Sequence, residues 1–227
     1  MSISTERLSQ VAGVCLVAAG ALFIGVQINH PPLTLDFVGT NEFVVRQTLK
    51  IFMTVLALIG ITGLYASHAR ALGVLGLVGY VLFGAGYLTM FSVEVIAGFV
   101  LPAIAQTSPA YVQDVLTAAQ GGAPAADIGN IQILLSLSGI GYLVGGLLFG
   151  IALFRARVVA RWAAALLAVA TVSTVALAVL PESFNRPFAI PTGIALIGLG
   201  WSSWRTRAAT VAEDVTESVH VATHSSR

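Results

Sequence analysis

The chain has 227 residues, of which 57% are hydrophobic and only 9% are charged. Soluble globular domains carry about 25% charged residues, so this composition, with a mean hydropathy of +0.91, excludes an ordinary soluble domain. The formal net charge of +1 provides no basic surplus for binding nucleic acid, and the single cysteine, Cys15, excludes an intrachain disulfide.

Six apolar runs follow one another along the chain, and each is long enough for a membrane-spanning helix, which needs roughly 17–25 residues. They cover approximately residues 8–28, 43–65, 72–101, 128–154, 158–180 and 188–204. The sequence therefore predicts an all-α fold, in which a bundle of six transmembrane helices forms one domain over residues 1–205. We expect residues 206–227, which are polar, to form a flexible cytoplasmic tail.

The longest connection between predicted spans joins the third to the fourth. In it, Ser108 followed by Pro109 is a typical helix start, and Val112, Val115 and Leu116 recur at helical spacing. We expect a short amphipathic helix on the extracytoplasmic surface of the membrane. The alternative is a plain surface loop.

Basic residues predict the orientation of the spans. With the N-terminus inside, the inner segments hold Arg7, Arg70, Arg155, Arg157, Arg161, Arg205 and Arg207. The outer segments then hold Arg46, Lys50 and Arg186. Arginine and lysine are enriched on the cytoplasmic side of membrane proteins, so both termini are predicted to be cytoplasmic. The excess of Arg over Lys, with abundant Ala, Gly and Val, is typical of GC-rich bacteria, which favours a bacterial cytoplasmic membrane.

The third run, which is almost wholly apolar, carries one charge, Glu94. Tyr80, Tyr87 and Phe91 precede it at helical spacing, so the four side chains are predicted to share one helix face. Charged groups at membrane depth are costly and often functional. This polar and aromatic stripe is therefore the main candidate for a functional site.

A basic partner for Glu94 is expected on the preceding span. The helical rise of 1.5 Å per residue places Arg46 and Lys50 at a depth similar to that of Glu94, near the outer boundary. We therefore expect Glu94 to face the bundle and to pair with Lys50 or Arg46, because an unpaired charge is costly there.

Three interpretations of this cluster remain open. The first is a structural ion pair at the membrane interface, with the aromatic residues packed beside it. The second is an outward-facing pocket in which Glu94 is an acid, a base or a cation ligand. Its ligand-binding candidates are Tyr80, Tyr87, Phe91, Glu94, Arg46 and Lys50. The third is that Glu94 faces the outer water.

The fourth run is rich in small residues, with Gly141 and Gly145, and then Gly146 and Gly150, at small-xxx-small spacing. Such pairs let helices approach closely, and the run is a candidate surface for a homo-oligomer. Residues 13–23 and 139–149 also share two glycines and a closing Leu-Phe, a candidate internal repeat of the kind found in transporters.

Residues 141–167, GYLVGGLLFGIALFRARVVARWAAALL, contain a glycine-rich span, an arginine-containing turn and then Arg-Trp-Ala-Ala. This segment resembles a run seen in six-span bacterial integral membrane proteins of uncharacterised activity. The resemblance implies membrane class and topology, and it implies no activity and no site residues.

Three classes of function are compatible with the sequence. A non-enzymatic membrane module that binds a lipid, a small apolar ligand or a partner protein is favoured, because polar residues within the spans are few. A small ion-coupled transporter would need more of them near the midplane. A membrane-embedded enzyme of the isoprenoid-cyclase type would use Glu94 as proton donor. No cofactor and no metal site is expected, since no predicted span contains histidine.

Overall fold

The computed structural model describes residues 5–175, 187 and 189–204, and the regular elements in these ranges are all helical. This confirms the all-α prediction. In chain order the elements are α1 (Thr5–Gly25), α2 (Leu35–Val38), α3 (Asn41–Val95), the π-helical turn η1 (Ile96–Val100), α4 (Leu101–Ile104), α5 (Pro109–Ala119), α6 (Ile131–Ala156) and α7 (Arg161–Ser173). Residues 189–204 are helical as well.

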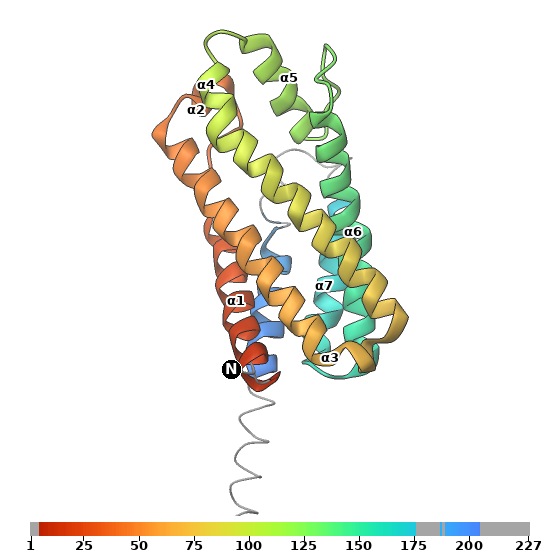
Figure 1. The fold of residues 1–227 in the computed structure, drawn as a ribbon. Coiled ribbons are helices and arrows are strands. Elements are labelled where there is room, and N and C mark those ends of the chain that lie inside the picture. Colours follow the sequence, from red (N-terminus) through yellow and green to blue (C-terminus); the bar gives the residue numbers. More distant parts are fainter. Residues whose placement is uncertain (1–4, 176–186, 188, 205–227) are drawn as a thin grey trace, which may run out of the picture.

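The longest helical element, α3, is a hairpin of two helices joined by a bend. Its backbone leaves the helical region at His68 (φ −131°, ψ 15°) and at Gly73 (φ 59°, ψ −158°). A positive φ is readily adopted only by glycine, so Gly73 suits the point where the chain reverses. Figure 1 shows the orange first arm (residues 41–67) descending to this bend and the yellow second arm (residues 74–95) returning beside it. The second and third predicted spans correspond to these two arms.

Among the described residues, three helical segments are long and apolar enough to cross a membrane: Leu8–Gly25, Asn41–Ile104 and Ile131–Ala156. The second of them contains the hairpin, so its 64 residues run first one way and then the other. The apolar helix α7 is shorter, and the predicted end of its span, like the tail at 206–227, lies outside the described residues.

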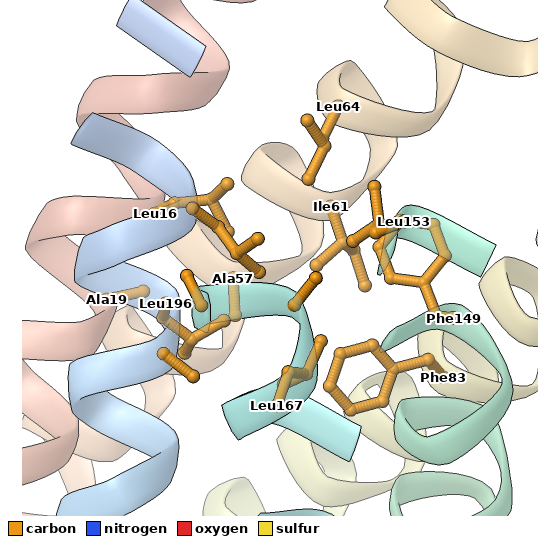
Figure 2. Close-up of a cluster of buried hydrophobic side chains, with 14 of the residues drawn as sticks. Leu16, Ala19, Ala57, Ile61, Leu64, Phe83, Phe149, Leu153, Leu167 and Leu196 are labelled. Atoms are coloured by element: carbon orange, nitrogen blue, oxygen red, sulfur yellow. The ribbon is translucent and has the colours of Figure 1, made fainter. Parts of the chain in front are cut away.

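A cluster of buried apolar side chains holds the long helices together. Leu16 of α1, Ile61 and Phe83 of α3, Phe149 of α6, and Leu196 are each no more than 1% exposed. Figure 2 shows these side chains converging with Leu167 of α7 from helices far apart in the sequence. Residues 189–204 and α7 are therefore integral parts of the bundle.

Glycines permit the close contacts between these helices. An added Cβ on Gly141 of α6 would lie 2.7 Å from the Cα of Gly86 on the second arm of α3. An added Cβ on Gly13 of α1 would lie 2.8 Å from the carbonyl oxygen of Gly200. Gly145, Gly146 and Gly150 of α6 likewise meet neighbouring helices of the same chain. The small-residue pairs of the fourth predicted span thus pack within the molecule.

A second apolar cluster closes the end of the bundle opposite the α3 bend. It joins Phe43, at the start of α3, to Leu101 of α4 and to Val112, Val115 and Leu116 of α5. The segment after Ser108 is helical, as predicted, and forms α5, whose three apolar residues are buried against the protein. Its place on the extracytoplasmic surface of a membrane stays a prediction. Figure 1 shows α4, α5 and one end of α6 together at this end, where the candidate site lies.

Candidate functional site

One face of the first α3 arm supplies half of the site. Thr40 caps this helix by accepting a hydrogen bond from the backbone N–H of Phe43 through its hydroxyl. Phe43, Gln47 and Lys50 then recur at intervals of three and four residues, so they lie on one helix face. Glu94 lies in the last turn of the second arm, so the hairpin brings residues far apart in sequence into contact.

Three polar side chains meet at this point. Gln47 donates a hydrogen bond of 2.8 Å from Nε2 to Oε2 of Glu94. The Nζ of Lys50 lies 3.7 Å from the same oxygen, an ion pair longer than a hydrogen bond. The side chains of Lys50 and Glu94 are only 16% and 14% exposed, so both are largely removed from the solvent. Glu94 thus pairs with Lys50, one of its two expected partners.

The amide of Gln47 has an unused acceptor. A carboxylate only accepts hydrogen bonds, so the amide nitrogen must face Glu94 and the amide oxygen must point elsewhere. This Oε1 is buried and has no hydrogen-bond partner among the described residues, and Gln47 as a whole is 4% exposed. A buried polar atom without a partner costs roughly 1–3 kcal/mol. Such a cost is recovered when a ligand or a water molecule donates to the oxygen.

The π-helical turn η1 begins two residues after Glu94. It places Gly98 against Gln47, where an added Cβ would lie 3.0 Å from the Cβ of Gln47. Single π-helical turns inside longer helices are frequent at functional sites. The helix then continues through Pro102 to Ile104, beyond the end predicted for the third span, because a proline at the start of a new helical segment needs no N–H partner.

A pocket of about 320 Å³, partly open to the outside, adjoins these side chains. Ligand pockets in proteins commonly range from about 300 to 1,000 Å³ and are mostly apolar with a few polar groups. Here the polar lining residues are Gln47, Lys50, Glu94 and Ser138. The apolar ones include Met90 and Val93 of α3, Ala97 of η1, Leu101 of α4, Val115 and Leu116 of α5, and Ile131 and Leu135 of α6.

Arg46 does not belong to this cluster. Its Nε donates to Glu42 at 2.9 Å, and its terminal nitrogens donate to the carbonyl oxygens of Val26, Ile28 and Asn29, which follow α1. Of the two alternative partners expected for Glu94, Lys50 is therefore the one that the structure shows, and Arg46 is not. The reason is that adjacent residues on a helix point about 100° apart, and the helix face toward Glu94 is occupied by Gln47, the next residue after Arg46.

The aromatic candidates are distributed along the second arm and are not among the residues that line the pocket. Tyr80 stacks on Tyr65 with a ring separation of 4.5 Å. Tyr87 is fully buried beside Phe83 in the core of the bundle. Phe91 is half-buried. The structure thus brings Glu94 and Lys50 together at the pocket and places Tyr80, Tyr87 and Phe91 elsewhere.

Gln47 is the functional candidate that the sequence analysis missed. The signal was present, since Gln47 lies three residues before Lys50 on the same helix face and is the only glutamine within the first arm. The contributions of α5 and α6 to the pocket carry no comparable signal, because their lining residues are ordinary apolar side chains.

The chemistry available at the site is that of recognition by charge and hydrogen bonding. No group of three or more His, Cys, Asp or Glu residues that could hold a metal ion occurs within the part of the chain that the structure describes. The pocket combines an ammonium group, a carboxylate that is hydrogen-bonded to Gln47 and ion-paired with Lys50, and an unused amide oxygen. Comparison with protein-family models, curated proteins and solved structures finds no match to this chain.

Proposed function

We propose that this protein is an integral membrane protein with six spans, and that its outer end binds an amphipathic lipid in the pocket beside Glu94. The observation that carries this proposal is the composition of the pocket. An apolar lining from α3, η1, α4, α5 and α6 suits a hydrocarbon chain, and one polar corner of Gln47, Lys50 and Glu94 suits a head group.

Three features support six spans, and a fourth supports their orientation. The hairpin divides α3 into two antiparallel arms, each of about 30 Å or more at 1.5 Å per residue, close to the thickness of the hydrocarbon layer. The helices α1 and α6 are long enough for one span each. Leu167 of α7 and Leu196 are buried in the core that these spans share. Arg70 lies in the bend of α3, and Arg155 and Arg161 lie at the end of α6 and the start of α7, whose connection lies near that bend in Figure 1. These arginines favour that end as cytoplasmic and the pocket as extracytoplasmic.

Binding is a better account of this cluster than catalysis or ion transport. The only carboxylate at the pocket, Glu94, is held by Gln47 and Lys50 within the described structure, so its charge is already matched. A lipid ligand requires no further ionisable group. The pocket lies at one end of the apolar helices and is partly open, and we propose that a membrane lipid enters through this opening. The amphipathic helix α5 then covers the pocket from the extracytoplasmic side.

The test is lipid retention measured by native mass spectrometry. The protein is purified in detergent, delipidated and re-exposed to a total bacterial lipid extract. Ala97→Trp fills the pocket from η1 and should abolish the retained lipid, and Ser138→Phe, from α6, should weaken it. The matched control, Val78→Trp, adds the same side chain at an exposed position (42%) on the second arm and should retain lipid as the parent does. Equal retention in all four proteins, each shown to be folded by thermal melting, would contradict the proposal.

A further inference from the structure

We propose that the lipid held in this pocket has an uncharged hydroxyl head group, which bridges the amide oxygen of Gln47 and the ammonium group of Lys50. This inference rests on the proposed function and narrows the class of ligand. It follows from the balance of charge at the polar corner of the pocket and from the hydrogen-bonding capacity that its residues leave unused.

The charges that line the pocket cancel. Lys50 and Glu94 are the charged residues among its lining, and they lie 3.7 Å apart. Arg46, the nearest further cation along the helix, is engaged by Glu42 and by backbone carbonyl oxygens. An anionic head group would have to compete with Glu94 for a single ammonium group, and a cationic one would have to compete with Lys50 for the carboxylate. The corner therefore suits a neutral head group.

The unused hydrogen-bonding groups of the pocket include both an acceptor and donors. The Oε1 atom of Gln47, buried and without a described partner, needs a donor. Lys50 has three N–H donors and contacts Glu94 at more than hydrogen-bonding distance, so it has donors to offer to an acceptor. A hydroxyl group supplies one donor and two acceptor lone pairs in a single atom. An ether or ester oxygen would satisfy Lys50 and leave the oxygen of Gln47 unpaired.

The hydroxyl belongs to a membrane lipid rather than to a soluble polyol. Of the residues that line the pocket, all but Gln47, Lys50, Glu94 and Ser138 are apolar or glycine, and all but Leu33 come from helices at one end of an apolar bundle. A soluble polyol would bury several hydroxyl groups against these apolar walls without partners, which is unfavourable. A single hydroxyl at the end of a hydrocarbon chain matches both parts of the pocket.

The experiment compares four probes of equal chain length on the delipidated full-length protein by native mass spectrometry. The probes are hexadecanol, its methyl ether, hexadecanoate and hexadecylamine. We expect hexadecanol to bind about tenfold more tightly than the methyl ether, the equivalent of one hydrogen bond to a buried group. Hexadecanoate and hexadecylamine should bind no more tightly than the ether. Glycerol alone should not compete with hexadecanol.

Gln47→Met removes the amide at nearly constant length and should bring the hexadecanol and ether affinities together. Gln132→Met, the same change at an exposed position of α6, should leave the tenfold preference intact. If Gln47→Met does not fold, the preference of the unmodified protein among the probes still decides the matter.

Two kinds of failure can be told apart. Equal binding of hexadecanol and its ether, or tighter binding of the carboxylate, with both lost in Ala97→Trp, would overturn the hydroxyl inference and leave the lipid pocket standing. Competition by glycerol alone would overturn the assignment to a lipid. If no probe binds, or if binding persists unchanged in Ala97→Trp, the proposed function itself fails.

Discussion

Arg46 ties the first arm of α3 to the end of α1. Its guanidinium group bonds to Glu42 and to three carbonyl oxygens that follow α1. Carbonyl groups at a helix C-terminus lack partners within the helix, and an arginine is suited to several of them because its five donors form a planar fork. This explains the basic residue at this depth without a role in ligand binding.

Replacement of Arg46 by glutamine should therefore lower stability. We expect a loss of about 1–2 kcal/mol in the free energy of unfolding, since hydrogen bonds to charged groups contribute more than neutral ones. Arg46→Lys should recover only part of it, because an ammonium group cannot reach all the carbonyl oxygens at once. Arg155→Gln, at an exposed site, should change stability by less than about 0.5 kcal/mol. Denaturant titration in detergent measures the free energy of unfolding of all three variants. An unchanged value for Arg46→Gln would refute the stabilising role of Arg46 between α1 and α3.

The ion pair between Lys50 and Glu94 calls for a double-mutant cycle. Removing one partner of a desolvated ion pair costs about 3–5 kcal/mol, whereas removing one partner of a pair near the membrane–water interface costs much less. The single changes Lys50→Gln and Glu94→Gln should each destabilise, and the double change should be less harmful than their sum by about 1 kcal/mol. The control cycle pairs Lys50→Gln with Glu42→Gln, which contacts Arg46 instead and should be additive. Strict additivity in the first cycle would rule out an energetic pairing.

Helix packing between the second arm of α3 and α6 depends on glycine at particular positions. An added Cβ at Gly86 would lie 2.5 Å from the backbone nitrogen of Tyr142, a distance that forces the helices apart. Two residues earlier on the same arm, Gly84 has nothing within 4 Å of its added Cβ. The two positions therefore form a matched pair.

Gly86→Ala should destabilise the protein by about 1–3 kcal/mol, the usual cost of overpacking in a close-packed interior. Gly84→Ala should be neutral or stabilising by up to about 1 kcal/mol, since alanine favours the helix. Thermal unfolding in detergent compares the two. A larger loss for Gly84→Ala than for Gly86→Ala would contradict the described interface.

The helix α5 has one buried face, which contains Val112, Val115 and Leu116, and one exposed face, which contains Gln113. Spin labels introduced along 109–119 should show mobility that varies with a period near 3.6 residues, lowest at Val112, Val115 and Leu116 and high at Gln113. Electron paramagnetic resonance spectra of the labelled proteins measure it. Uniformly high mobility would show that the segment is a loop in solution.

At the scale of the whole molecule, the bend of α3 and the helix α5 lie at opposite ends of the bundle (Figure 1). With Cys15 replaced by alanine, single cysteines at Ser108 and Ala71, both exposed, report the two ends separately. We expect only the first to react with an impermeant thiol reagent in intact cells, because the arginines near the bend favour the cytoplasmic side. Labelling after cell disruption is the control for reactivity. Equal or reversed labelling in intact cells would contradict the proposed orientation.

The sequence by itself determined the class of the protein and the approximate course of its helices. Apolar runs of sufficient length can be recognised locally, because a helix satisfies its own backbone hydrogen bonds and depends little on distant residues. The pairing of Glu94 with Lys50 was predictable for a related reason. Consecutive antiparallel helices bring residues of equal depth side by side, and depth can be counted along the chain.

The tertiary structure alone decided which neighbour each side of a helix meets. Tyr80, Tyr87 and Glu94 share a helical period, yet Tyr80 stacks on Tyr65, Tyr87 is buried in the core, and Glu94 borders the pocket. The period is a local property of the chain, whereas the partner depends on how distant helices are rotated and packed. For the same reason Gln47 contacts Glu94 and Arg46 does not. Adjacent residues on one helix point about 100° apart, and only the packing of the helices decides which of them faces the site.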